Sequence, residues 1–258
     1  MILSLWLGLS AGCSDQTAGV SVRMPADRRP DLDAKMLTRG SLTIPGDQPF
    51  NYPKFRSGQE GDAARGAAKA IGEDGAGCSA EVEGEGVAWG EFVLAYCFDN
   101  MTDKTLDAVV RAKIIVHQSV TRKGKQDDVI GAAATKGSLI FYIEDASAGH
   151  VLKQRQLISA EPEQGPQSST TRHDLVFDVK LEPGRGYYLV FSGRADVRAE
   201  QGQDGGLQIE VSDVSLDIHW QVAASSVRTD ADDAGHNASL IDTADDQPPA
   251  SASKVAHE

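Results

Sequence analysis

The chain has 258 residues, a formal net charge of −13 and a pI near 4.9, and 40% of its residues are hydrophobic. Sequence-independent binding to nucleic acid needs a basic surface that displaces counterions from phosphates, so this charge argues against a nucleic-acid partner. The apolar content suffices for one good hydrophobic core, as in a single β-sandwich domain of about 200 residues.

The chain begins with a short apolar segment that ends in small residues and a cysteine. The apolar stretch is about ten residues long, far short of the roughly 20 residues that cross a bilayer as a helix. It has the length of a signal-peptide core. Ser10, Ala11 and Gly12 then lead directly into Cys13.

The run from Leu9 to Cys13 resembles the lipobox of bacterial lipoproteins, although its large aliphatic residue lies four positions before the cysteine instead of three. The resemblance implies that residues 1–12 are a signal peptide and that Cys13 becomes a lipidated N-terminus. The chain would then be exported to the cell envelope with the membrane as a partner, and Ser14 after the cysteine favours the outer membrane. The alternative is an N-terminal segment with no targeting role.

Residues 13–76 show little sustained periodicity and contain five prolines among many charges. We expect the lipidated cysteine and a flexible tether here. Two parts of the tether are candidates for local order: Ser41–Ile44 as a short strand and the alanine-rich residues 62–71 as two helical turns.

Residues 77–222 alternate apolar and polar side chains, which predicts β-strands. Residues 87–98 are apolar on both faces, as in a central strand. Strands follow at 110–116, at 139–152 with a hairpin turn at 144–150, and at 175–181, where Pro183 and Gly184 reverse the chain. The last strands are 187–197, 207–211 and 214–222, and a change of phase at Ser212 and Asp213 predicts a bulge.

The fold class predicted is therefore all-β, an antiparallel β-sandwich of either jelly-roll or immunoglobulin-like topology. After residue 222 the apolar pattern stops. Residues 223–258 are acidic and poor in large apolar side chains, so we expect a disordered tail.

Two cysteines remain once Cys13 is assigned to lipid. An exported protein favours a disulfide between Cys78 and Cys97. The alternative is two separate buried thiols, and the spacing of the pair matches neither a redox nor a zinc motif.

A possible ligand face lies on the last strand, where polar side chains alternate at Asp213, Ser215, Asp217 and His219 and continue to Gln221. Such a row can bind sugar hydroxyls or a cation, but it is also typical of the wetted face of an antiparallel sheet. The carboxylates of Asp127–Asp128 and Glu144–Asp145 are alternative candidates.

The sequence predicts no catalytic residues, metal ligands or cofactor. The histidines are scattered without metal-binding spacing. His173 and Asp174 are neighbours in a strand and point to opposite faces, and Ser192 lacks the motif of a nucleophile elbow.

Three functional hypotheses follow. The first is a lipid-anchored envelope protein whose sandwich is a binding or structural module, with an envelope protein or a glycan as partner. The second narrows the module to carbohydrate or peptidoglycan binding. The third is a hydrolase of envelope polymers.

Overall fold

The computed structural model describes residues 40–123, 133–160 and 167–223. Within these ranges the chain forms nine strands and no helix, and every strand pairing is antiparallel. The strands are β1 (Ser41–Ile44), β2 (Tyr52–Glu60), β3 (Ala64–Ala70), β4 (Ala76–Asn100), β5 (Leu106–Lys123), β6 (Ala134–Asp145), β7 (His150–Ala160), β8 (Gln167–Leu181) and β9 (Arg185–Val222).

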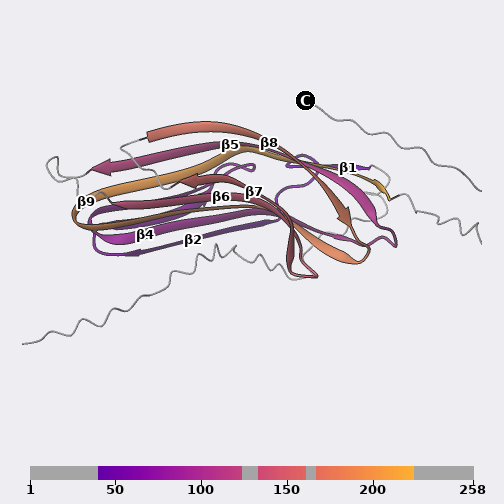
Figure 1. The fold of residues 1–258 in the computed structure, drawn as a ribbon, viewed down its shortest axis with the longest axis horizontal. Coiled ribbons are helices and arrows are strands. Elements are labelled where there is room, and N and C mark those ends of the chain that lie inside the picture. The colour runs from indigo at the N-terminus through magenta and orange to yellow at the C-terminus, as the bar shows by residue number, and fades with distance from the viewer. Residues whose placement is uncertain (1–39, 124–132, 161–166, 224–258) are drawn as a thin grey trace, which may run out of the picture. The chain divides into compact units, whose positions relative to one another are not determined.

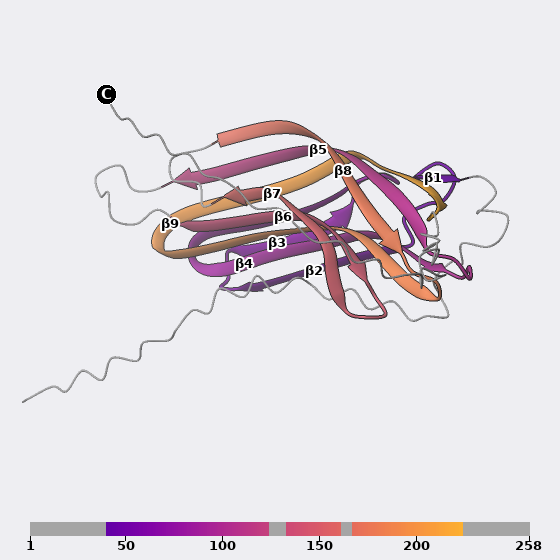
Figure 2. The same cartoon turned by 45° about the vertical axis from the view of Figure 1, so that its right-hand side comes forward.

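The strands are arranged in two layers. We call layer 1 the sheet in which β2, residues 87–100 of β4, residues 185–199 of β9, β6 and β7 lie side by side. In layer 2 the order is β3, residues 76–84 of β4, residues 203–222 of β9, β5 and β8, and β1 pairs with the end of β9. Figures 1 and 2 show β4 and β9 curving round from one layer into the other.

The bend in β4 depends on two glycines. The register with β9 shifts between Gly84 and Gly86, whose φ angles are +93° and +156°. Any other residue at these angles would be strained. Glycine therefore allows β4 to bend into the second layer while it remains paired with β9 on both sides of the bend.

This strand order identifies the jelly-roll alternative. β4 and β9 each run through both layers. On one side of β9, β5 pairs with it in layer 2 and β6 pairs with it in layer 1. Beyond them, β8 pairs with β5 and β7 pairs with β6. Two layers built from strands that wrap together in this way are the arrangement of a jelly roll.

The core lies between the layers, where the inward side chains of both sheets meet. Phe141 of β6 joins them, because its ring is 4.7 Å from that of Phe191 in its own layer and 5.5 Å from that of Phe177 in layer 2. Burying an aromatic side chain of this kind contributes about 2 to 3 kcal/mol.

Several local predictions are confirmed. β4 is a central strand, and the hairpin turn between β6 and β7 lies at residues 146–149, inside the predicted range 144–150. Gly184 has a φ of +68°, as the third position of the predicted turn requires, and Asp213 at the predicted bulge has a φ of +49°. The three last predicted strands are parts of one long strand, β9.

The prediction of a flexible tether is wrong for residues 41–70, where three strands extend the sandwich. Ser41–Ile44 is the expected short strand, but the expected helix at 62–71 is the strand β3. Its small residues serve close packing: a Cβ on Gly66 would collide with the backbone carbonyl oxygen of Trp89 in layer 1. Composition suggested helix because alanine favours it, whereas tertiary packing requires small side chains here.

The predicted signal peptide at 1–12, Cys13 and the acidic tail after residue 223 lie outside the described residues. The predicted end of the sandwich at Val222 coincides with the last residue of β9.

Candidate functional site

The predicted ligand face lies on the outward side of layer 2, near the end of β9. Asp213, Ser215, Asp217 and His219 all point away from the core, because the residues between them, such as Leu216 and Ile218, are buried. Asp217 accepts a hydrogen bond of 2.9 Å from Oγ1 of Thr43 in β1. His219 lies beside Ser41 on one side and Val109 of β5 on the other.

A shallow pocket of about 520 Å³ opens where β9, β5 and β8 run side by side. Three consecutive residues from each strand line it: Asp107, Ala108 and Val109; Asp178, Val179 and Lys180; His219, Trp220 and Gln221. The antiparallel register brings these nine residues together although they are far apart in the sequence.

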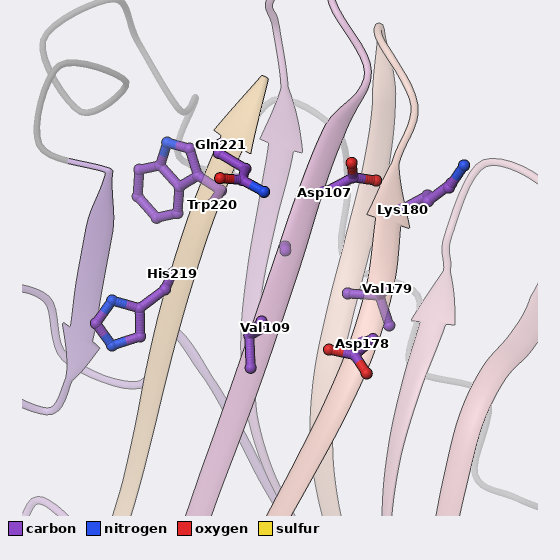
Figure 3. Close-up of a pocket in the computed structure, with 9 residues that line it drawn as sticks. Asp107, Val109, Asp178, Val179, Lys180, His219, Trp220 and Gln221 are labelled. Atoms are coloured by element: carbon purple, nitrogen blue, oxygen red, sulfur yellow. The ribbon is translucent and has the colours of Figure 1, made fainter. Parts of the chain in front are cut away.

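The outward side chains of the pocket form two rows across the strands. Gln221, Asp107 and Lys180 are direct neighbours in the first row, and His219, Val109 and Asp178 in the second. Direct neighbours on one face have Cβ atoms about 4.5 to 5.5 Å apart. Figure 3 shows the Asp178 carboxylate turned toward β5, whereas Lys180 extends away from the pocket.

This arrangement offers hydrogen-bonding groups around an apolar centre. Asp107 and Asp178 present carboxylates, Gln221 and His219 can both donate and accept, and the half-buried Val109 lies between them. None of the nine lining residues is a serine, threonine, cysteine or tyrosine. The pocket therefore suits the binding of hydroxyl groups better than attack by a hydroxyl or thiol nucleophile.

Of the four residues singled out from the sequence, the structure brings only His219 into the pocket. Ser215 lies beside Lys113 and Asp217 beside Arg111, farther along β9. Asp107, Asp178 and Lys180 were missed as site residues. Their alternation in β5 and β8 showed that they face outward, but only the strand order shows that they adjoin His219.

A second polar cluster lies on the outward face of layer 1. Arg194 stacks 5.1 Å from the ring of Trp89, and its guanidinium binds Asp196 at 2.7 and 2.8 Å and Glu91 at 3.3 Å. The hydrogen bonds to Asp196 are the main cause of a raised Arg194 pKa. Because the Arg194 guanidinium is already engaged by both carboxylates and by the Trp89 ring, we interpret this group as a structural contact between β4 and β9.

The other candidates from the sequence do not assemble into a catalytic site. Nε2 of His173 is 3.0 Å from Oγ1 of Thr171 on β8, whereas Ser192 lies on β9 in layer 1. Asp145 is buried beside the β6–β7 turn and binds Arg185 at 2.7 Å. Asp127 and Asp128 lie outside the described residues.

The predicted disulfide between Cys78 and Cys97 is wrong. Both thiols are buried and no disulfide joins them, which is the alternative that the sequence left open. Cys78 points into the core from layer 2, and Cys97 points outward from layer 1, so the sheet itself separates the two sulfurs. A disulfide needs Cα atoms about 4.4 to 6.8 Å apart with converging Cβ directions.

The described part of the chain contains no cluster of three or more histidine, cysteine, aspartate or glutamate side chains placed to hold a metal ion. It also contains no helix of the length and apolarity needed to cross a membrane.

Comparisons with known proteins show a weak likeness to several solved structures. The enzymatically active domain of bacteriophage CBA120 tailspike protein 4 has 11% identity and a TM-score of 0.23 over 63% of this chain, which spans 19% of that domain. The family 11 carbohydrate-binding module of Clostridium thermocellum, solved with a β-1,3-1,4-mixed-linked tetrasaccharide, has 13% identity and a TM-score of 0.21. The match covers 63% of this chain and 87% of the module.

A carbohydrate-binding module of the β-sandwich superfamily has 15% identity and a TM-score of 0.18, with 65% of this chain and 56% of that chain covered. No protein-family model and no curated protein sequence matches this chain.

Proposed function

We propose that this chain is a lipid-anchored binding module of the bacterial cell envelope, and that it holds a glycan in the pocket between β9, β5 and β8. The observation that carries the glycan site is the double row of hydrogen-bonding side chains around Val109. It is presented by three adjacent strands of one sheet, so the groups are held in place before a ligand arrives.

Recognition would use the chemistry of a sugar ring. Hydroxyl groups of the ligand would donate to the carboxylates of Asp107 and Asp178, and Gln221 and His219 would complete the hydrogen bonds of the oxygens. The carbon-bound hydrogens of the ring would contact Val109. Lys180 extends away from this centre, where it can meet an acidic substituent or a neighbouring sugar unit.

Binding is favoured over hydrolysis by the composition of the lining. A hydrolase with a serine, threonine or cysteine nucleophile would need such a residue in the pocket, and none of the nine lining residues supplies one. We therefore place a hydrolase with a serine, threonine or cysteine nucleophile behind the binding module.

The test of the glycan site is a calorimetric titration with two probes, muropeptides released from peptidoglycan and the β-1,3-1,4-linked tetrasaccharide, at concentrations up to about 1 mM. We expect the wild-type chain to bind at least one probe. Asp107→Ala and Asp178→Ala should each weaken binding about 10- to 150-fold, since a hydrogen bond to a charged group contributes about 1.5 to 3 kcal/mol.

Asp174→Ala is the matched control, because Asp174 lies on the outward face of the same strand, beside Lys113 and outside the pocket. Its affinity should equal that of the wild type. Failure of the wild type to bind either probe, or equal losses in all three variants, would contradict the proposed site.

The anchor is tested separately by the intact mass of the chain extracted from bacterial membranes. Support for it comes from the segment Leu9 to Cys13. A mass that begins at Cys13 and includes acyl chains is the expected result, and Cys13→Ser should release the protein from the membrane fraction. An unprocessed mass in the soluble fraction would contradict the anchor and leave the glycan site to its own test.

A further inference from the structure

β8 (Gln167–Leu181) is the outermost strand of layer 2. Among the described residues it pairs only with β5, so one side of its backbone has no strand partner there. Figures 1 and 2 show β8 at the margin of the sheet, beyond β5. We call this free side of the strand the β8 edge. Unpaired N–H and C=O groups along such an edge are a template for pairing with another strand.

The β8 edge is long and regular. It runs over 15 residues, contains no proline, and keeps an unbroken register with β5. Other edge strands carry features that hinder pairing: β7 has two register shifts against β6, β2 contains Pro53, and β3 has only seven residues. Proteins use such features to prevent association between sheet edges. β8 has none of them, so its edge is well suited to receive a further strand.

Apolar side chains at the β8 edge are incompletely covered. Leu175 and Phe177 point inward and pack against the core, but they are only half-buried. The residues beside them on β5, Ala112 and Val110, are buried. On the outward face, Val176 is 57% exposed. A strand added beyond β8 would cover these side chains, and their burial would favour its addition.

We propose that the β8 edge pairs with the β8 edge of a second copy of this chain, antiparallel about a two-fold axis at Phe177. In this register the two strands overlap over residues 173–181. Phe177 lies opposite Phe177 of the second copy, and Leu175 lies opposite Val179. The inward row of the joint is therefore apolar. Because of the two-fold symmetry, every contact between unlike residues occurs twice.

The charges of the outward row favour a second copy as the occupant and also select the register. Asp174 lies opposite Lys180 of the second copy. Arg172 lies opposite Glu182, the residue just past the end of β8. Opposite charges that face each other across two strands stabilise their pairing. A register shifted by two residues would place Asp174 opposite Asp178, and like charges at that distance repel.

The side chains that would form these pairs are available. Arg172, Asp174 and Lys180 are exposed, and none of them has an ion pair with another described residue. Lys180 extends away from the pocket and from β5 in Figure 3. Oε2 of Glu182 accepts a hydrogen bond of 2.8 Å from Oγ1 of Thr105, which leaves Oε1 for Arg172 of the second copy.

One consequence of the pairing rests on the proposed function. Asp178 and Lys180 line the pocket and also belong to β8. In the dimer Asp178 lies opposite Val176 of the second copy, so the two pockets adjoin on one continuous outward face. A glycan long enough to enter both pockets would bind with a higher apparent affinity. The ammonium group of Lys180 has three donors, so a bond to Asp174 of the second copy leaves donors for such a ligand.

Sedimentation velocity of the full-length chain tests the pairing. Every protein carries Cys13→Ser and no glycan is present, so the result depends on neither the anchor nor the pocket. We expect the chain with the native β8 to show a monomer–dimer equilibrium at concentrations up to about 100 µM. Asp174→Lys and Lys180→Asp each turn two attractive pairs into two repulsive ones, and each should raise the dimer Kd about tenfold or more. The double variant restores opposite charges and should recover most of the lost affinity.

Lys69→Asp is the matched control, because Lys69 is exposed on β3, at the opposite edge of layer 2. It makes the same change of charge as Lys180→Asp and should leave the dimer Kd unchanged. A chain with the native β8 that stays monomeric would overturn the proposal. So would single reversals that dimerise as well as Lys69→Asp, or a double variant that dimerises no better than the single ones.

Hydrogen exchange provides a measurement that needs no substitution in β8. The backbone N–H groups on the free side of residues 173–181 should exchange more slowly at about 100 µM than at about 1 µM, because they become paired in the dimer. The N–H groups of β3 should exchange equally at both concentrations. Protection that appears in another strand but not in β8 would contradict pairing through the β8 edge.

Discussion

The side-chain amide of Asn51 takes the place of a strand beside Cys97. Its Nδ2 donates to the carbonyl oxygen of Cys97 at 2.7 Å, and its Oδ1 accepts from the N–H of Cys97 at 2.8 Å. Cys97 is fully buried, so water cannot replace this partner. Asn51 thus continues the hydrogen-bond ladder of β2 past its first residue, Tyr52, to the end of β4.

Replacing Asn51 should destabilise the sandwich. Asn51→Ala leaves two buried backbone groups without this partner, and we expect a loss of about 2 to 4 kcal/mol in the free energy of unfolding. Asn51→Asp keeps the acceptor and should lose about half as much. Urea denaturation measures both values, with Gln59→Ala on exposed β2 as the control that should stay within about 0.5 kcal/mol of the wild type. An unchanged midpoint for Asn51→Ala would contradict the role of the amide.

The close approach of the layers near the bend gives a second prediction. A Cβ on Gly90 would collide with the carbonyl oxygen of Ala67 and lie 2.7 Å from that of Ser79, both in layer 2. Gly90→Ala should therefore destabilise the protein by about 3 kcal/mol, because two backbones would have to separate.

Gly206→Ala is the matched control for Gly90→Ala. A Cβ there would meet its nearest neighbour, Cβ of Thr121, at an ordinary 3.6 Å. This substitution should be neutral or stabilising by up to about 1 kcal/mol. Equal thermal stability of the two variants would show that the layers separate more easily than the structure indicates.

The hydrogen bonds of Asp145 at the turn between β6 and β7 predict that the stability of the protein depends on pH. Burial alone would raise the pKa of Asp145, but the hydrogen bonds from Arg185 and from the N–H groups of Ala148 and Ser147 outweigh it and lower the pKa below its usual 3.8. A lowered pKa in the folded state adds stability above pH 3.8, and this stability is lost as the pH falls through the folded-state pKa.

The wild type should therefore exceed Asp145→Asn in the free energy of unfolding at neutral pH, and the difference should shrink on acidification below pH 3.8. Urea titrations from about pH 7 to about pH 2 follow this window. Arg185→Gln should move the loss of stability to higher pH, because it removes one cause of the lowered pKa. A difference in the free energy of unfolding between the wild type and Asp145→Asn that does not change with pH would contradict this role of Asp145.

The two buried cysteines predict a distinctive pattern of alkylation. Burial is the main cause that raises the pKa of Cys78 to about 12, so its thiol should resist iodoacetamide in the native state near neutral pH. In urea without a reductant, the Cys13→Ser protein should take up two labels, on Cys78 and Cys97. Mass spectrometry distinguishes this from a disulfide, which would leave both cysteines unlabelled until reduction.

Strand positions and faces were predictable from local pattern. Residues 87–98 carry apolar side chains on both faces, which indicated a central strand. Pro183 and Gly184 indicated a turn. Both features depend only on neighbouring side chains and local backbone angles. The bulge at Asp213 was visible in the same way. These predictions required no knowledge of which strands pair.

Pairing was not predictable, and the candidate site depends on it. His219 could be recognised as outward-facing, but nothing in its strand shows that Val109 and Asp178 lie beside it. The helix expected at residues 62–71 failed for a related reason, since its alanines meet a second layer that local propensity does not contain.

The sequence by itself determined the all-β class, the end of the sandwich at Val222 and the side of the sheet on which residues 187–197 and 207–222 lie, because a strand's period of two is a local property. Only the tertiary structure decided the jelly-roll order, the separation of Cys78 from Cys97 and the grouping of Asp107, Asp178 and His219. Each of these depends on contacts between residues distant in the chain, and the free energy of such contacts comes from burial and register, which no single segment encodes.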